Sequence, residues 1–324
     1  MARPFDGYEV EAELRPQARD CAFDLEQALN SVVALEARVA PDAFTAPILG
    51  TERLGNGAVI GANGLVLTIG YLITEAAEVT LTLNDGARVA AHPLGVDAVT
   101  GFGVVQALEP LGLPALPLGD SRQLRAESPV VIAGAGGRTH AAAGQVLTRM
   151  PFAGYWEYLL DDALITEPGH PHWSGAALIG AKGDLVGVGS LSLEARSREG
   201  PKPINMFVPI DLLPPILDDL ARGKAPHAPR PWLGVLAQEM QDRVVIVGTS
   251  PQSPAARAEL KAGDMVLAVA GQPVADLADF YQKLWALGPA GVVAPLTLAR
   301  EGDVFDVEVR SADRTKLLKW PRGN

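Results

Sequence analysis

The sequence predicts a mainly β protein, in which a large all-β region of the barrel or sandwich type precedes a smaller domain of mixed α/β structure. Short apolar runs recur between turn signals from residue 55 to residue 209, a spacing typical of barrels and sandwiches rather than of βαβ units. The Asn63-Gly64 dipeptide separates two of these runs and is a strong signal for a tight hairpin. After the proline-rich stretch 223–231, strands alternate with helices instead.

Turn signals and prolines divide the chain into successive elements. Residues 1–45 are predicted to be a helical lead-in that ends near Pro41, and "NDG" at 84–86 marks a second hairpin. The stretch 210–223 is predicted to be a helix, interrupted early by Pro214 and Pro215. The stretch "GKAPHAPRP" is the strongest candidate for a linker between domains. The predicted domains are a lead-in at 1–45, an all-β domain at 46–222, a linker at 223–231, a compact α/β domain at 232–312 and a tail at 313–324.

Composition and charge narrow the class of protein. The net charge of −11 argues against a nucleic-acid partner, because a phosphate backbone repels an acidic surface. Cys21 is the single cysteine, so no disulfide forms within the chain. There is no run of eighteen apolar residues, and we expect no membrane span. The N-terminus carries no apolar segment of the secretory type, so we expect a cytoplasmic protein if Met1 is the natural start. The alanine-rich composition with a single cysteine fits a bacterial chain.

Four stretches, in this order, resemble the HtrA/Deg-type bacterial serine proteases, which join a chymotrypsin-like double β-barrel to a C-terminal PDZ domain. They are "GNGAVIGANGLVLT", "LPALPLGDSRQLRAESPVVIAG", the block from "ALITEP" to "WSGAALIGAKGDLVGV", and "RPWLGV" with "SPAARAELKAGDMVLAVAGQPV". The resemblance covers roughly residues 50–312. It implies that 46–222 is the trypsin-like double barrel and that 232–312 is the PDZ domain.

The resemblance also implies where a catalytic triad belongs, and only one of its three residues is present. The histidine position is occupied by Tyr71 in "VLTIGYLI", and the aspartate position by Gly101 in "TGFGVV". Ser174 in "HWSGAAL" is retained at the nucleophile position. A tyrosine is neutral at pH 7 and donates rather than accepts a proton, and a glycine has no side chain to orient a base. We therefore expect Ser174 to be vestigial.

The residues just before Ser174 also depart from the family pattern. His172 lies where the family has a glycine that shapes the oxyanion hole, and Trp173 is positioned to cover or fill the old cleft. His170 or His172 remains open as a substitute base for Ser174. The same two histidines are an alternative metal pair, but no third ligand is evident, so a solvated surface loop is the simpler interpretation and no metal site is predicted.

The PDZ-like domain retains the parts of a peptide-binding site. Such domains add an extended peptide to a sheet edge and hold its C-terminal carboxylate with backbone N–H groups. The resemblance places the carboxylate loop in "WLGV", the pairing strand at Ala237, and the opposite wall on the helix "LADFYQKLWAL". A groove filled by the chain's own barrel domain is the alternative. The predicted peptide-binding residues are Trp232, Leu233, Gly234, Val235, Ala237, Phe280 and Leu284.

Together these patterns predict a catalytically inactive HtrA-like protein, or pseudoprotease, that binds protein C-termini or extended peptides and acts as scaffold, regulator or chaperone-like factor. A serine endopeptidase with a non-standard active site built on Ser174 is the alternative. No cofactor is expected. Members of the resembled family form trimers through N-terminal segments, and the atypical segment here leaves a homo-oligomer open.

Overall fold

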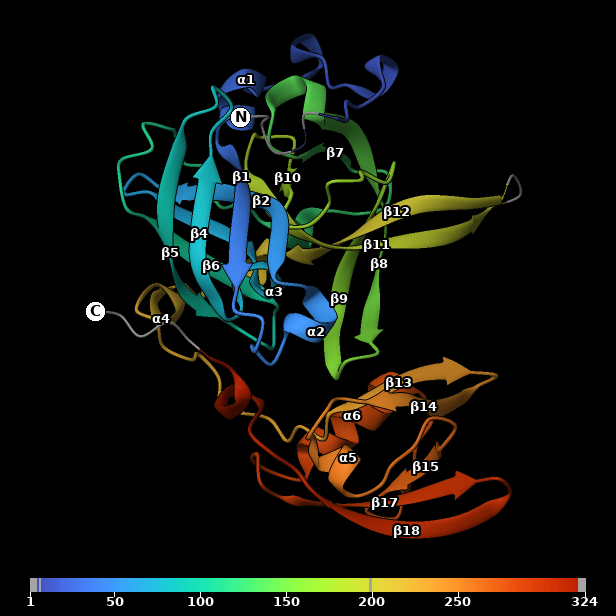
Figure 1. The fold of residues 1–324 in the computed structure, drawn as a ribbon. Helices are drawn as coiled ribbons and strands as arrows, with labels where there is room; N and C mark the ends of the chain where they lie inside the picture. Colours follow the sequence, from blue (N-terminus) through green and yellow to red (C-terminus); the bar gives the residue numbers. More distant parts are fainter. Residues whose placement is uncertain (1–4, 6, 198–199, 320–324) are drawn as a thin grey trace. The chain divides into compact units, whose positions relative to one another are not determined.

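The computed structural model describes residues 5, 7–197 and 200–319, and within them the chain forms two compact units. The first unit holds the described residues up to Met150, together with Asp162–Pro226 and Lys319. The second holds His227–Leu318 and, from an earlier part of the chain, Pro151–Asp161. The mainly β fold predicted from the sequence is confirmed in both units (Figure 1).

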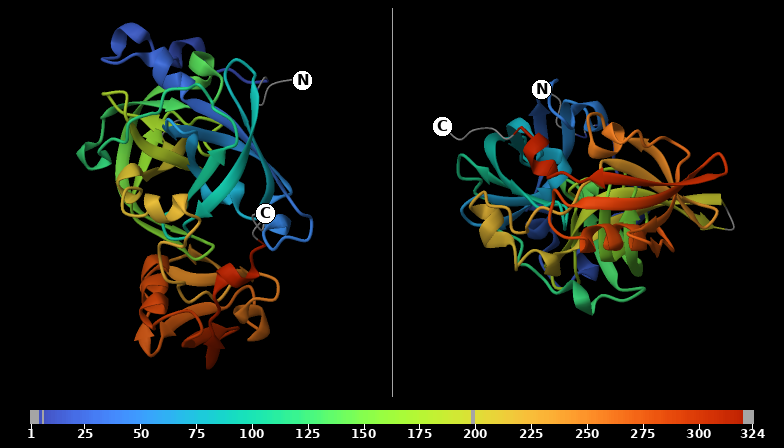
Figure 2. Two further views of the ribbon diagram at one scale, coloured as in Figure 1. Left: turned by 90° about the vertical axis from the view of Figure 1, so that its left-hand side faces the viewer. Right: turned by 90° about the horizontal axis from the view of Figure 1, so that it is seen from below.

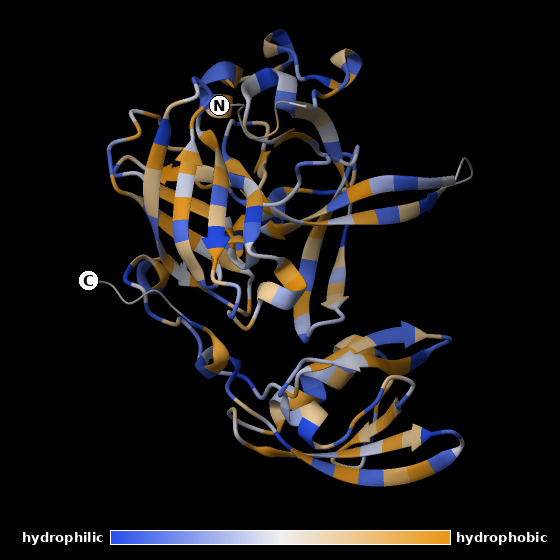
Figure 3. Ribbon diagram, in the orientation of Figure 1, coloured by the Kyte–Doolittle hydropathy of each residue, from blue (hydrophilic) through white to orange (hydrophobic). Residues whose placement is uncertain are grey.

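Two closed six-stranded antiparallel barrels make up the first unit (Figure 1). Hydrophobic and hydrophilic residues alternate along many of their strands (Figure 3), as expected where one face of a strand points into a barrel. The first barrel runs β1-β2-β3-β6-β5-β4 and the second β10-β11-β12-β9-β8-β7. The strands are β1 Val32–Val39, β2 Glu52–Gly61, β3 Leu65–Ile69, β4 Ala76–Thr82, β5 Arg88–Val96, β6 Phe102–Ala107, β7 Pro129–Ala133, β8 Ala141–Gly154, β9 Tyr158–Glu167, β10 Ala177–Ile179, β11 Leu185–Ser197 and β12 Gly200–Pro209.

The helices of the first unit are all short. Gly70–Ile73 forms α3 directly after β3, and the expected early break at Pro214 and Pro215 separates the turn η5 from α4. The β11–β12 hairpin extends away from the other strands of its barrel (Figures 1 and 2). The remaining helical segments of this unit are η1 Ala12–Leu14, η2 Ala18–Asp20, α1 Leu25–Asn30, α2 Ala46–Leu49, η3 Ser121–Gln123, η4 Gly137–His140, η5 Ile210–Leu212 and α4 Leu217–Ala221.

The predicted helical lead-in is wrong over its last third, because Val32–Val39 is strand β1 of the first barrel. β1 pairs with β2 on one side and β4 on the other, so its backbone groups are satisfied by the sheet. Val32, Val33 and Leu35 are completely buried. Burial on both faces of a strand removes the polar–apolar alternation by which a strand is recognised in sequence.

The second unit is an antiparallel sheet with two helices. The order β13-β14-β15-β17-β18 leaves β13 at an edge, and β16 pairs only with β15. α6 begins after Asp276, whose carboxylate accepts a hydrogen bond from the backbone N–H of Asp279 as a helix N-cap. The elements are β13 Val235–Met240, β14 Arg243–Thr249, α5 Pro254–Arg257, β15 Met265–Val269, β16 Gln272–Pro273, α6 Leu277–Ala286, β17 Val293–Arg300, β18 Asp303–Arg310 and η6 Arg314–Leu317. The last five residues of the predicted tail lie outside the described residues.

Candidate functional site

The three triad positions lie together where the two barrels meet. The N–H of Gly70 donates to the carbonyl of Gly101 at 2.7 Å, which places residue 101 beside α3 and so beside Tyr71. The Tyr71 hydroxyl lies 2.8 Å from Ser174 Oγ. Gly101 itself has a φ of 86°, a backbone conformation that favours glycine. The sequence assignment of these positions therefore describes one cluster in space.

The hydroxyl of Tyr71 has two neighbours, which fixes the direction of both hydrogen bonds. It donates to the backbone carbonyl of Ser190 at 2.8 Å, because a carbonyl only accepts. The phenol has a single proton, so its contact with Ser174 is one in which the serine donates and Tyr71 accepts. Burial raises the pKa of Tyr71 well above its ordinary value, against the hydrogen bond with Ser174, which lowers it. The acceptor of the hydrogen bond from the Ser174 hydroxyl is thus a neutral phenol.

His170 does not replace the missing base. Its Nδ1 accepts a hydrogen bond from the backbone N–H of His172 at 3.1 Å, so Nε2 carries the proton and donates to the carbonyl of His140 at 3.1 Å. Burial, reinforced by the neighbouring His172, lowers the pKa of His170 to about 4. Both ring nitrogens are committed, so the imidazole has no lone pair available for Ser174.

His172 is held in an aromatic environment rather than against the serine. Its ring contacts Phe5 at 4.1 Å and Tyr8 at 5.2 Å between centroids. Burial lowers its pKa, with a contribution from His140. Within the described ranges, Tyr71 is the one hydrogen-bond partner of Ser174 Oγ, and no group of three or more His, Cys, Asp or Glu side chains forms a metal cluster.

One backbone donor expected in an oxyanion hole is also occupied. The N–H of His172, two residues before the serine, is bonded to His170 Nδ1. A donor already bonded within the protein is not directed at a developing negative charge. A cavity of about 390 Å³ still borders Tyr71, Trp173 and Ser174, so Trp173 lines the old cleft and does not fill it.

Asn56 of β2 fixes the loop that carries the serine, and the sequence analysis missed it. Its completely buried side chain donates to the carbonyls of His172 and Ser174 at 2.8 and 3.0 Å and accepts from the N–H of Ala135 at 2.8 Å. One amide thus satisfies three backbone groups that the barrels bury. An asparagine between two glycines in an apolar strand is the signal by which it could have been found.

We expect Asn56→Ala to lower the free energy of unfolding of the first unit by about 2 kcal/mol, because backbone groups lose buried partners. Urea denaturation of both proteins, followed by circular dichroism, measures the change. Asn30→Ala is the matched control, since Asn30 is exposed, and its effect should stay within about 0.5 kcal/mol. Equal losses in the two variants would show that the amide of Asn56 contributes nothing special.

The predicted carboxylate loop does hold a carboxylate, and it comes from within the second unit. The backbone N–H groups of Leu233, Gly234 and Val235 all donate to Glu157, at 3.1, 2.6 and 3.1 Å for the shortest contact of each. Gly234 has a φ of 77°, and a Cβ there would lie 2.2 Å from Ser253 Cβ. Only glycine fits this position, so the loop depends on it.

The other predicted groove residues lie around the same segment. The N–H of Ala237 on β13 donates to the carbonyl of Tyr155 at 2.9 Å. Phe280 and Leu284 of α6 are fully buried in the core of the unit, and Trp232 is 7% exposed. The segment that carries Tyr155 and Glu157 therefore contacts the predicted pairing strand at Ala237 and the predicted carboxylate loop at Gly234. The role of the predicted groove residues in binding an external peptide stays a prediction.

Comparison with known proteins adds relatives for both units. A model of the trypsin-like peptidase domain matches residues 55–188, and a PDZ domain model matches 231–310. The curated protein "Probable periplasmic serine endoprotease DegP-like" of Halomonas elongata is 30% identical over 287 residues, which is 83% of this chain and 57% of the relative. Its namesake in Pseudomonas fluorescens is 28% identical over 275 residues, 80% of this chain and 56% of the relative. The chain thus spans little more than half the length of these two relatives.

Solved structures show the same fold. "HtrA-type protease AlgW with tripeptide" superimposes with a TM-score of 0.53 at 21% identity and covers 95% of this chain and 99% of that one. A serine endoprotease from Yersinia pestis gives a TM-score of 0.52 at 22% identity, with 89% and 96% covered.

The names of the curated relatives contradict the cytoplasmic location expected from the sequence, because they place those proteins in the periplasm. The expectation rested on the residues that follow Met1, and it is wrong by this comparison. In the described part of the chain, none of the helices has both the length and the apolar character needed to span a bilayer.

Proposed function

Because the chain is an HtrA-type protease homologue with a C-terminal PDZ domain, we propose that it acts by binding protein segments and does not cleave them. The observation that carries this proposal is the hydrogen bond of Ser174 to Tyr71, in the place where the family has a histidine. As a pseudoprotease the protein serves as scaffold, regulator or chaperone-like factor through its PDZ domain. We also propose that it works in the periplasm, as the names of its relatives say of those proteins.

Proton transfer is the step that the cluster does not support. Attack by a serine requires a base that takes its proton and returns it to the leaving group, with a pKa near the working pH. Tyr71 is a neutral phenol whose own proton is donated to Ser190, and Gly101 offers no carboxylate. Loss of the base from a triad enzyme costs roughly 10⁶ in turnover. The occupied N–H of His172 removes part of the remaining electrostatic stabilisation.

A serine endopeptidase with a non-standard active site is the second candidate. The relatives named above are serine endoproteases, and the cavity beside Ser174 has room for a side chain of a substrate. His172 is the remaining imidazole near the serine, since both nitrogens of His170 are engaged. In this alternative the ring of His172 would have to leave Phe5 and Tyr8 and reach Ser174 Oγ.

Covalent labelling with a fluorophosphonate probe distinguishes the two candidates, because the probe reacts with activated serines. Purified protein, a Ser174→Ala variant and an active HtrA-type enzyme are incubated with the probe and their intact masses are measured. We expect a mass shift in the active enzyme only. Labelling of the wild type that disappears in Ser174→Ala would establish an activated serine and overturn the proposal. A further His172→Ala variant would then show whether that ring is the base.

A further inference from the structure

We propose that Tyr155–Glu157 is a built-in ligand of the PDZ domain, which occupies the peptide groove and must leave before an external C-terminal peptide enters. The inference rests on the proposed function, since it assumes that the groove binds peptides. It assigns to Glu157 the place that the terminal carboxylate of an external ligand would take. The protein is therefore self-inhibited for peptide binding.

The carboxylate loop at 233–235 already binds a carboxyl group, that of Glu157. Three successive backbone N–H groups, from Leu233, Gly234 and Val235, converge on Oε1 of the Glu157 side chain, and that of Leu233 also reaches Oε2. A peptide's C-terminal carboxylate offers the same two oxygens as acceptors. A set of donors directed at one oxygen holds one carboxylate at a time. Glu157 and an external C-terminus therefore compete for the same donors.

The same segment also contacts the edge of the sheet at β13. β13 is an edge strand, so its outer N–H and C=O groups can accept an added strand. The Tyr155 carbonyl receives the N–H of Ala237, which is the backbone bond that strand addition would begin with. Glu157 follows Tyr155 by two residues, and its carboxylate lies in the loop that precedes β13. The segment thus engages both parts of the groove.

The helix α6, which forms the opposite wall of the predicted groove, also contacts the segment. The Tyr281 hydroxyl donates to the carbonyl of Gly154 at 2.8 Å and accepts from the N–H of Glu157 at 3.2 Å, so both ends of the turn are attached to the helix. Leu159, which is 9% exposed, belongs to the same buried core as Phe280 and Leu284. The apolar surface that would receive the side chains of a peptide is already covered.

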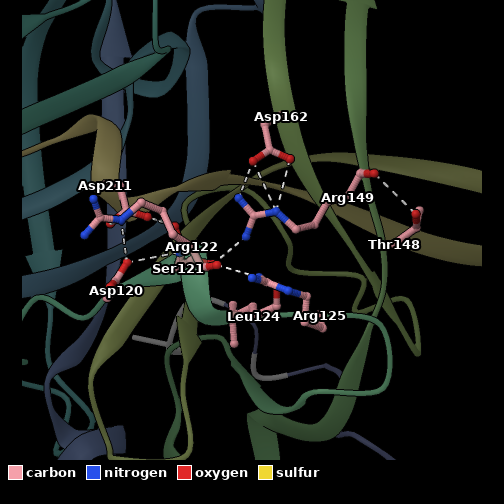
Figure 4. A network of polar contacts seen from close by, with 9 residues as sticks. All are labelled: Asp120, Ser121, Arg122, Leu124, Arg125, Thr148, Arg149, Asp162 and Asp211. Atoms are coloured by element: carbon pink, nitrogen blue, oxygen red, sulfur yellow. Dashed lines mark hydrogen bonds and ion pairs between the residues drawn. The ribbon is translucent and has the colours of Figure 1, made fainter.

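The strands β8 and β9 hold the segment on a short tether. Residues 155–157 form the turn between β8 and β9, and immediately outside Pro151–Asp161 the guanidinium of Arg149 on β8 bonds both carboxylate oxygens of Asp162 on β9 (Figure 4). Arg149 also donates to the carbonyl of Ser121. A ligand on a short tether has an effective concentration on the order of millimolar. A free peptide has to overcome that advantage.

The contact between Glu157 and the carboxylate loop is also expected to depend on the protonation of the Glu157 carboxyl. Burial raises the pKa of Glu157 to about 7, although the three N–H donors and the charge of Arg314 lower it; Tyr281 on α6 is the other titratable group that faces it. The docked form therefore holds a proton more tightly than an undocked glutamate, whose ordinary pKa is about 4.3. Between these two values undocking releases a proton, so a rising pH favours the open groove.

The test is a binding titration with full-length protein. The probe is a pool of fluorescein-labelled random decapeptides with an apolar last residue and a free carboxyl end, and the same pool with amidated ends is the negative control. Binding is read by fluorescence polarisation for the wild type, Glu157→Ala and Glu157→Gln. Asp161→Asn is the matched control, because Asp161 lies exposed on the same hairpin. Circular dichroism verifies that each variant is folded.

We expect Glu157→Ala to bind the carboxyl-ended pool at least about ten times more tightly than the wild type and Asp161→Asn, a gain of about 1.4 kcal/mol. Equal, measurable binding by the wild type and Glu157→Ala would overturn the built-in ligand and leave the proposed function intact. No binding by any variant would overturn both.

A pH series separates the role of Glu157 from other effects. From pH 5.5 to pH 8 we expect the affinity of the wild type for the pool to increase, and that of Glu157→Gln to stay level by comparison. The same increase in Glu157→Gln would assign the titration to another group and contradict the role of this side chain.

Discussion

Phe280→Ala is expected to lower the free energy of unfolding of the second unit by about 3–5 kcal/mol, which is the range for truncating a fully buried aromatic ring. Phe280 has no exposed surface and lies in the core formed by β13, β14, β15, β17 and α6. Alanine removes the ring and leaves a cavity that close-packed neighbours fill only in part. The destabilisation is comparable to the whole stability of many small domains.

Urea unfolding monitored by tryptophan fluorescence measures this effect, because Trp156, Trp232 and Trp285 belong to the second unit, whereas Trp173 belongs to the first. Two units can unfold in separate transitions, so the transition that these tryptophans report is fitted by itself. Val304→Ala is the control, since Val304 is 64% exposed on β18, and it should change the midpoint little. A loss below about 1 kcal/mol for Phe280→Ala would contradict the packed core described here.

Arg300→Met is expected to cost about 3 kcal/mol in the same unit, because it leaves a buried carboxylate without its cation. Asp264 has no exposed surface, and its two oxygens bind Arg300 Nε and Nη2 at 2.6 and 2.8 Å. We take the low end of the range for buried pairs because the Arg300 side chain is 30% exposed and is partly screened by water. Methionine keeps most of the apolar stem.

The pH dependence identifies the cause of that loss. Burial alone would raise the pKa of Asp264, but the hydrogen bonds from Arg300 and from the N–H of Lys261, with their charges, outweigh it and hold the pKa below its usual value. The pair therefore contributes stability above the unfolded pKa near 3.9, and this is lost as the pH falls through the lower folded value. In Arg300→Met burial is no longer opposed by the cation and raises the pKa of Asp264, so the carboxyl takes up a proton as the pH falls and the difference between variant and wild type should shrink from pH 7 to pH 4. A difference that is constant over this range would assign the loss to packing.

The hairpin at Asn63-Gly64 was accessible from sequence because a tight turn depends on residues close together in the chain. The Asn63-Gly64 turn joins β2 and β3 as predicted, since Gly64 at a φ of 81° has the backbone conformation that such a turn requires. Tyr71, Gly101 and Ser174, which are far apart in the chain, were assigned by resemblance alone; they lie near one another in space, and their assignment to a triad stays a prediction.

Glu157 could not be recognised in the same way. In the run "YWEYLL" it is a single acidic residue among aromatic and apolar neighbours, and no local pattern marks it as a ligand. Its role comes from donors at 233–235, far along the chain, and from the hydroxyl of Tyr281. The flanking glycines mark Asn56 in the sequence, but its three hydrogen-bond partners, at Ala135, His172 and Ser174, could not be recognised from it. Contacts between distant segments are set by tertiary structure, which local patterns do not report.

The contacts around Ser174 also bear on how the two barrels are joined. In an active triad the serine hydroxyl is hydrogen-bonded to a histidine that can take its proton. Here Tyr71 and Asn56 of the first barrel are cross-linked by hydrogen bonds to Ser174, Ser190 and His172 of the second. The loop that carries Ser174 is thus fastened to the first barrel, and the serine contributes to the junction between the barrels as a structural residue.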